Sequence, residues 1–332
     1  MISVIVLTYN QEDTITRTLD SVLMQECDEP IEIVIGEDCS ADNTRAICEE
    51  YARRYPDKIR LMPKAPNKGV VDNYFDCLLA CRGEYIADCA GDDFWIDRHK
   101  LQKETDVLRK DKSVTLVHTD WMNYDEQTGD TRPCPPRPFN SPITDGKTML
   151  EAIVTQTSLP VIHLCTALYR KDVLMKAYDE DTFLFRNKDF GCEDLQVCFA
   201  LAKAGNIAFI NDHTLNYGIG RQSVSSNNDT EKQFGFVKRV TELSFYLSEK
   251  YNIKSDKTDE YFKARVFALL MHAFRARSKA LRKEALRCRK RWGVKPSLMI
   301  ATATVVTSND VTWSAALCIR KYFLKFKSDG AR

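Results

Sequence analysis

The sequence predicts an α/β protein with a mostly parallel sheet, helices on both faces of that sheet, and a helical C-terminal extension. Three observations support this. Short β-branched runs alternate with amphipathic helical stretches through the first half of the chain. The opening run, residues 2–7, is continuously apolar, which suits a strand buried on both faces. From Asp229 onward the pattern is helical throughout. We therefore expect domains at 1–228 and 229–332.

The expected elements follow in β-α-β-α-β-α-β order. Asp13 is a candidate cap for the first helix, which carries Ile15 and Leu19 at helical spacing. Residues 131–142 hold five of the 11 prolines, which argues against regular structure and favours a surface loop, interpreted as a flap over a cleft. The other expected strands lie at 31–35, 59–62, 84–88, 114–118, 163–169 and 207–210, and the other helices at 42–55, 70–81, 98–109 and 193–204.

The composition is that of an ordinary globular protein. Of the 332 residues, 44% are apolar and 29% charged, with 13 Gly and 11 Pro, which excludes collagen-like, low-complexity and disordered chains. The 12 cysteines are scattered, and we interpret them as reduced thiols of a cytoplasmic protein. The first residues lack a basic leader, and no apolar run approaches the roughly 20 residues that span a bilayer. We expect neither a secretory signal nor a transmembrane helix.

Charge is distributed unevenly. Residues 260–332 contain 17 Lys and Arg against 4 Asp and Glu, whereas the rest of the chain is acidic. Phe262, Val266 and Leu269 share a helical face in this basic region, and a second such segment begins at Trp313. Basic amphipathic helices suit an anionic membrane surface. Alternatively, their apolar faces pack on the acidic body of the protein. Both interpretations remain open, so peripheral attachment to the inner face of the membrane is a hypothesis.

Polar clusters follow three predicted strands, where ligands bind in open α/β sheets. Two are residues 8–10 and 37–40, and the third contains the adjacent carboxylates Asp92 and Asp93. Such carboxylates repel each other unless a cation or hydrogen-bond donors compensate, and Mg²⁺ and Mn²⁺ prefer carboxylate oxygens. Helix capping by Asp93 or Asp97 is the alternative. No glycine-rich phosphate loop of a known type is present.

Two further acidic positions are candidates. Glu193 and Asp194 open a predicted helix, where acids commonly complement the helix dipole, but a carboxylate there can also act as a general base. Asp38 follows the second strand and can accept hydrogen bonds from a ribose or a base, or can form an Asx-turn. His163 and His213 are interpreted as structural because they lack the spacing of a zinc site.

In this order, the segments resemble the family-two inverting glycosyltransferases, which use nucleotide-sugars and have the GT-A fold. The resemblance runs from residue 3 to about 225. It is carried by VIVLTYN at 4–10, EDCSADNT at 37–44, NKG at 67–69, GEYI at 83–86 and GDDFW at 91–95.

The resemblance implies an enzyme that moves a sugar, with inversion, from a UDP-sugar to a hydroxyl of a glycan or lipid-linked acceptor in surface polysaccharide biosynthesis. It implies that Asp92, with Asp93, holds Mn²⁺ or Mg²⁺ on the donor diphosphate and that Asp38 contacts the nucleobase. Asp194, paired with Glu193, is then the catalytic base. The implied nucleotide-sugar-binding residues are Thr8, Tyr9, Asn10, Glu12, Asp38, Lys68, Asp92 and Arg221.

The sequence departs from the family pattern at three positions. Ala90 replaces the first acid of the usual D-x-D element, and Gly218 and Gly220 stand where an Arg and a His are frequent. Arg221 can supply a cation to the diphosphate instead. Two other functions stay open: a catalytically silent glycan-binding or scaffold protein, and a nucleotidyltransferase. No nucleic-acid partner is expected, because no base-reading or stacking module accompanies the basic region.

Overall fold

The computed structural model describes residues 1–319 apart from 137, 140, 157–159, 221–228, 310 and 313. The chain forms two compact units, Met1–Arg221 and Gln222–Arg332.

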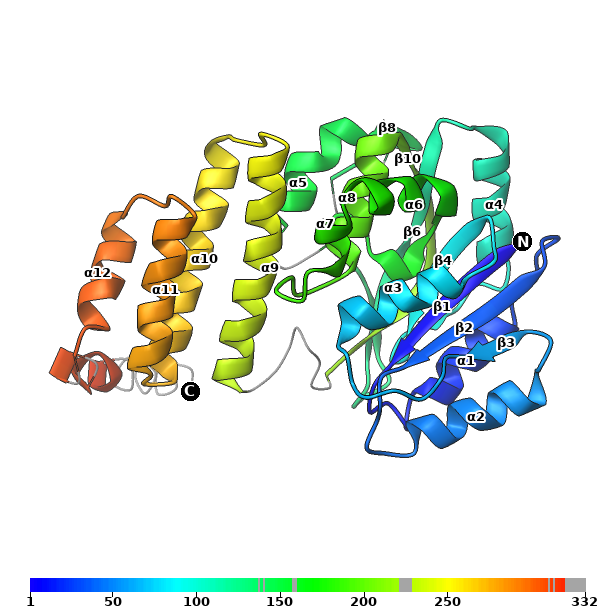
Figure 1. The fold of residues 1–332 in the computed structure, drawn as a ribbon, viewed down its shortest axis with the longest axis horizontal. Helices are drawn as coiled ribbons and strands as arrows, with labels where there is room; N and C mark the ends of the chain where they lie inside the picture. Colours follow the sequence, from blue (N-terminus) through cyan, green and yellow to red (C-terminus); the bar gives the residue numbers. More distant parts are fainter. Residues whose placement is uncertain are drawn as a thin grey trace. The chain divides into compact units, whose positions relative to one another are not determined.

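The described strands of the first unit form one sheet in the order β3-β2-β1-β4-β9-β6-β10-β5 (Figure 1). Strand β1 pairs in parallel with β2 and β4, β2 with β3, and β6 with β10. Strand β9 is antiparallel to β4 and β6, so these two share a direction. The strands are β1 (Ile2–Thr8), β2 (Ile31–Glu37), β3 (Ile59–Leu61), β4 (Tyr85–Ala90), β5 (Phe94–Trp95), β6 (Val114–Asp125), β7 (Thr131–Pro133), β8 (Ile143–Asp145), β9 (Ala167–Arg170) and β10 (Asn206–Ile219).

As a result, the parallel strands all finish at one edge of the sheet. We call this the carboxyl edge, defined by Thr8, Glu37, Ala90, Asp125 and Ile219. Strand β9 runs the other way, so its first residues and the turn before them also lie at this edge. The mostly parallel α/β architecture predicted from the alternating pattern is confirmed.

Helices cover both sides of the sheet. Figure 1 shows α1 and α2 on one side of β1, β2 and β3, and α3 on the other. The core between these layers is built from β-branched and aliphatic side chains such as Val4, Val6 and Ile33, all almost fully buried. The helices are α1 (Ile15–Leu23), α2 (Thr44–Arg54), α3 (Val70–Ala80), α4 (Lys100–Lys110), α5 (Leu150–Val154), α6 (Lys171–Glu180), α7 (Thr182–Arg186) and α8 (Asp194–Ala204), with short 3-10 helices η1 (Gly146–Met149) and η2 (Leu164–Thr166).

Three local predictions were wrong. The expected strand at 163–169 begins as η2, because the Thr166 hydroxyl donates to the carbonyl of His163 and closes a turn. The proline-rich stretch contains β7, which pairs with β6 through Pro133. Proline is tolerated there because β7 is an edge strand. The N-cap position of α1 is occupied by Thr14 rather than by Asp13.

The second unit is helical, as predicted from Asp229 onward. Asp229 accepts hydrogen bonds from the N–H groups of Glu231 and Lys232, and Ser255 forms a capping box with Thr258. Helix α10 contacts each of the other three. The described helices of this unit are α9 (Thr230–Lys250), α10 (Asp256–Arg275), α11 (Lys279–Arg291) and α12 (Leu298–Val306).

The apolar face predicted in α10 is covered by helices of its own unit. Phe262, Val266 and Leu269 are buried in one cluster with Trp292 and Ile300. Neither open interpretation of this face describes that arrangement: it is not exposed to a membrane, and its cover comes from α9, α11 and α12. Most of the second basic segment, from Trp313, lies outside the described residues. None of the described helices is both long and apolar enough to span a bilayer.

Candidate active site

The loops after β1 and β2 are joined by hydrogen bonds at the carboxyl edge. The N–H of Asn10 donates to Ser40 Oγ at 2.9 Å, and Asn10 Oδ1 accepts from the N–H of Ala41 at 2.8 Å. Glu12 Oε2 accepts from Asn43 Nδ2 at 2.7 Å. Asn10 and Glu12, predicted to bind the donor, therefore brace these two loops. Thr8 is buried and Tyr9 is half-exposed beside them.

Asp38 connects the loop after β2 to the segment that precedes α3. Its two carboxylate oxygens accept hydrogen bonds from the N–H groups of Lys68 and Gly69, each at 2.9 Å. Gly69 has φ +84°, a left-handed conformation that favours glycine. The Lys68 ammonium forms an ion pair with Asp76 on α3 at 2.6 Å. Asp38 and Lys68 thus lie at the carboxyl edge, and the side chain of each is bonded to another group of this chain.

Helix α1 holds the loop that carries the acidic pair. The hydroxyls of Thr14 and Thr18 donate to the carbonyls of Gly91 and Asp93 at 2.7 and 2.6 Å. Between them, Arg17 Nη2 donates to the carbonyl of Asp92 at 3.2 Å. Residues three and four apart share a helix face, so Arg17 and Thr18 on α1, together with its N-cap residue Thr14, secure three consecutive carbonyls. Sequence analysis missed this contact, although a Thr-x-x-Arg-Thr stripe on an otherwise apolar helix face was the available signal.

Asp92 has polar and charged neighbours. Gln11 bonds to its carboxyl, and burial raises the pKa of Asp92, with the charge of Glu126 adding to the effect. Arg17 pairs with Glu126 at 2.6 Å and lies over the Phe94 ring at 4.0 Å. Its bond to Asp92 goes to the carbonyl, and no ion pair to the Asp92 carboxylate occurs among the described residues. The charge of Arg17 lowers the pKa of Asp92 only from a distance, and a half-buried carboxylate without a direct ion pair suits a hard divalent ion.

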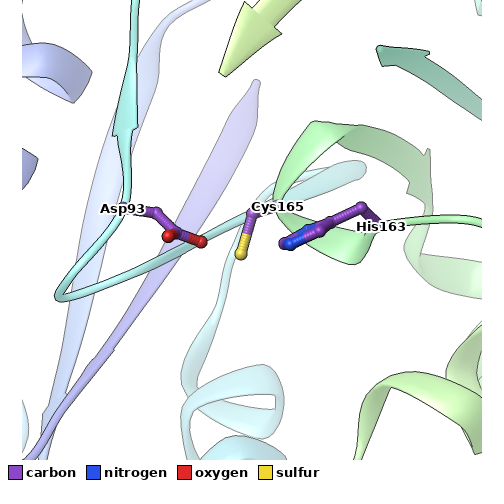
Figure 2. A group of neighbouring side chains, drawn as sticks. All are labelled: Asp93, His163 and Cys165. Atoms are coloured by element: carbon purple, nitrogen blue, oxygen red, sulfur yellow. The ribbon is translucent and has the colours of Figure 1, made fainter. Parts of the chain in front are cut away.

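Asp93 has different surroundings from Asp92. It is almost fully buried, and its Oδ1 accepts from the N–H of Gly218 at 3.0 Å. Burial raises the pKa of Asp93 well above its usual value, helped by the charge of Asp92. Its carboxylate faces Cys165 and His163 (Figure 2). One potential ligand atom from each of the three residues lies within 4.8 Å of the others.

Glu193 and Asp194 lie at the start of α8. The hydroxyl of Thr115, at the start of β6, donates to the carbonyl of Leu201, so the last turn of α8 lies near the edge opposite the carboxyl edge. The first turn is therefore directed toward the carboxyl edge. Burial raises the pKa of Glu193 to about 8, and the charges of Asp194 and Asp88 add to this. Asp194 Oδ1 accepts from the N–H of Leu195 at 2.7 Å.

A buried carboxyl that sequence analysis did not single out lies in the middle of β4. Asp88 Oδ2 accepts from the Tyr169 hydroxyl at 2.8 Å, and that hydroxyl is bonded in turn to the hydroxyl of Tyr74. Burial raises the pKa of Asp88 to about 7. The signal was an acid between the apolar strand residues Ala87 and Cys89. Because the Asp88 charge acts on Glu193, this network connects the sheet to the start of α8.

Comparison with known proteins identifies the family. The model of glycosyl transferase family 2 matches residues 3–177, more than half of the chain. The chain belongs to this family. An uncharacterised protein of Mycobacterium tuberculosis is 41% identical over 114 residues, which cover 34% of this chain and 33% of the relative. The chain thus spans about a third of the length of the curated relatives in this group.

Two solved structures share the fold of this family 2 chain. Staphylococcus aureus TarS 1-349, in complex with UDP-GlcNAc, aligns with a TM-score of 0.54 at 17% identity over 89% of this chain and 93% of TarS. A mannosyltransferase from Pyrobaculum calidifontis, in complex with GDP-Man and Mn²⁺, aligns with a TM-score of 0.54 at 18% identity over 95% of this chain and 86% of that protein. At these identities the likeness shows the fold, and the predicted GT-A class is confirmed.

The roles of the individual site residues stay predictions. Thr8, Asp38, Asp92 and Asp93 lie at or directly beyond the carboxyl edge. Glu193 and Asp194 begin the helix directed toward that edge. Arg221, predicted to meet the diphosphate, lies outside the described residues.

Proposed function

We propose that the protein is a metal-dependent, inverting glycosyltransferase that transfers a sugar from a UDP-sugar to a hydroxyl group of a glycan or lipid-linked acceptor. One observation carries this proposal. Asp92, whose carboxylate has no direct ion pair among the described residues, and a pair of acids, Glu193 and Asp194, come from distant parts of the chain to the same edge of the sheet. Donor activation and acceptor deprotonation need these two kinds of group together.

The donor side rests on Asp92 and on the loops braced around it. Because hydrogen bonds fix the carbonyls of residues 91–93, the backbone that carries the Asp92 carboxylate is held in place before any ligand binds. We assign the divalent metal, Mn²⁺ or Mg²⁺, to Asp92. When bound there, the ion would stabilise the negative charge of the departing nucleoside diphosphate. Ala90 offers no carboxylate, so Asp92 carries this task without the usual first acid.

The nucleotide is assigned to the loops after β1 and β2. Asp38 keeps acceptor capacity beyond its two bonds to the 68–69 backbone, because each carboxylate oxygen has two lone pairs. A uracil N–H is a donor that fits this capacity. The Thr8 hydroxyl is buried beside Gly91 and has no hydrogen-bond partner among the described residues, so we assign Thr8 to the floor of this site rather than to a direct contact with the donor.

Asp194 is assigned as the base. At neutral pH the raised pKa of Glu193 keeps a proton on that member of the pair, which leaves Asp194 to receive the proton of the acceptor hydroxyl. A single displacement follows: the acceptor oxygen bonds to the anomeric carbon, the bond to the diphosphate breaks, and the configuration inverts.

We also propose peripheral membrane attachment, and we assign it to the exposed apolar residues of α12. Leu298 is 86% exposed and Val305 is 64% exposed, and these residues lie two turns apart on one face of this helix. Val311, just beyond α12, is 78% exposed. Helix α11 ends in Arg289, Lys290 and Arg291. Apolar side chains with nearby basic ones favour an anionic lipid surface. Equal sedimentation with anionic and with neutral liposomes would reject this part.

The central test measures donor binding and turnover separately. We expect UDP-sugars to raise the Tm only with Mn²⁺ present, and Asp92→Asn to abolish this shift. In Asp194→Asn, UDP-sugars with Mn²⁺ should still raise the Tm, but UDP should no longer be released. Asp172→Asn is the matched control, because Asp172 is also a first-turn acid, on α6, and is exposed. Full turnover in Asp194→Asn would exclude it as the base, and a retained configuration in the product would exclude the single displacement.

A further inference from the structure

Three side chains with different metal-binding atoms converge behind the acidic loop. Asp93 follows β4, Cys165 is in η2, and His163 immediately precedes η2. Figure 2 shows the carboxylate, thiol and imidazole pointing toward one another. The ligand atoms lie within 4.8 Å of one another, whereas a tetrahedral ion bonded to all three holds them roughly 3.3–3.8 Å apart, so side-chain shifts of about 1 Å would close the site.

Backbone N–H groups already support two of the three ligand atoms. The N–H of Ala90 donates to Cys165 Sγ at 3.4 Å, and the N–H of Gly218 donates to Asp93 Oδ1 at 3.0 Å. Both bonds favour the anionic form of their acceptor. Metal ligands characteristically have such outer hydrogen bonds, which fix their orientation.

The imidazole is held by ring packing. The His163 ring lies 5.0 Å from the Trp121 ring and 4.8 Å from the Tyr217 ring, measured between centroids. These rings belong to β6 and β10, so the orientation of His163 is set by the sheet. All three candidate ligands are therefore positioned by neighbours that are themselves part of the fold.

The donor set separates this cluster from Asp92. Thiolate and imidazole select borderline-soft ions such as Zn²⁺, whereas Mg²⁺ and Mn²⁺ prefer oxygen ligands. A carboxylate and a thiolate also neutralise a divalent charge, which lowers the cost of burying it.

We propose that Asp93, His163 and Cys165 form a Zn²⁺ site, distinct from the donor-metal site at Asp92. Three protein ligands leave the fourth tetrahedral position to water or another small ligand. Binding converts the Cys165 thiol to a thiolate and releases its proton to solvent, and no electron transfer is involved. The ion would join the loop after β4 to η2, the turn that directly precedes β9. Strands β4 and β9 are neighbours in the sheet.

The test uses the purified full chain with Co²⁺ as a spectroscopic probe and with Zn²⁺ as a competitor. We expect a sulfur-to-cobalt charge-transfer band that Zn²⁺ removes, and about one tightly held Zn²⁺ per chain by elemental analysis. Cys165→Ser should abolish the band, and His163→Phe, which keeps an aromatic ring between Trp121 and Tyr217, should weaken Zn²⁺ binding by at least about 100-fold. Cys27→Ser, at a partly exposed thiol outside the cluster, should change neither the charge-transfer band nor the Zn²⁺ affinity.

The outcomes separate this site from the proposed function. Loss of the band in Cys165→Ser with retention in Cys27→Ser and in Asp92→Asn supports a site independent of the donor metal. The absence of a band in the parent protein, or an equal band in Cys165→Ser, overturns the proposal while leaving Mn²⁺-dependent donor binding intact. If Cys165→Ser fails to fold, unchanged Zn²⁺ affinity in His163→Phe overturns it equally.

Discussion

Thr18→Val tests whether α1 holds the acidic loop through its carbonyls. Thr18 is fully buried and its hydroxyl donates to the carbonyl of Asp93 at 2.6 Å. Valine keeps the shape of threonine and removes the donor, so the Asp93 carbonyl keeps only the weak thiol donor of Cys89 at 3.7 Å. An unsatisfied buried acceptor costs about 1–3 kcal/mol. For a unit of this size, that corresponds to a fall in Tm of roughly 2–4 °C per kcal/mol.

The matched control is Thr16→Val on the same helix. Thr16 is exposed, so the control carries the same change in helix propensity without a buried partner. Urea unfolding of both variants gives the difference in the free energy of unfolding, and calorimetry gives the Tm. We also expect weaker Mn²⁺-dependent donor binding in Thr18→Val, because the Asp92 loop is less rigid. A difference between the two variants below about 0.5 kcal/mol would refute the reasoning.

Three further predictions concern buried carboxyls. First, the raised pKa values of Asp88, about 7, and Glu193, about 8, mean that the folded state binds more protons than the unfolded state between roughly pH 4 and pH 8. The free energy of unfolding should therefore fall as pH rises through this window, and Glu193→Gln should flatten the slope in urea titrations at several pH values. Second, Tyr169→Phe removes the donor to Asp88 and should cost about 1.5–3 kcal/mol at pH 8, where Asp88 is mainly charged, and less at pH 6; an equal loss at both pH values would contradict this. Third, Asp38→Asn leaves one oxygen for two N–H groups and should cost about 1–3 kcal/mol, with weaker donor binding by calorimetry; unchanged stability would show that the 67–69 loop does not depend on it.

The fold was predictable because its signals are local. The apolar run of β1 and the alternation of strands and helices are patterns of consecutive residues. They predict the boundaries of the first four parallel strands to within a few residues. The strands at 114–118 and 207–210 were recognised but their length was not. Beyond residue 118, β6 continues through Asp120, Asn123 and Asp125, and its extension is held by pairing with β10, a partner far away in sequence.

The site was predictable only in part, for the same reason. Asp38, Asp92 and Asp194 could be named because each follows or begins an element at a recognisable position. His163 and Cys165 could not be named as a cluster with Asp93. They lie about 70 residues from Asp93 in sequence and approach it only through the turn of η2, so their spacing along the chain does not indicate the contact. The role of Thr14 and Thr18 depends equally on a loop they contact only after folding.

Gly218 limits which substitutions this part of the chain can accept. A Cβ atom at this position would lie 2.8 Å from the carbonyl oxygen of Asp92 and 3.0 Å from Glu126 Oε1. The backbone of β10 therefore leaves no room for a side chain between this position and the acidic loop unless one of the two segments shifts. An arginine or a histidine could therefore not be introduced by replacing Gly218 alone. Such a substitution would require the 91–93 loop and the end of β6 to be redesigned together, so the proximity of two main-chain segments fixes the residue at this position.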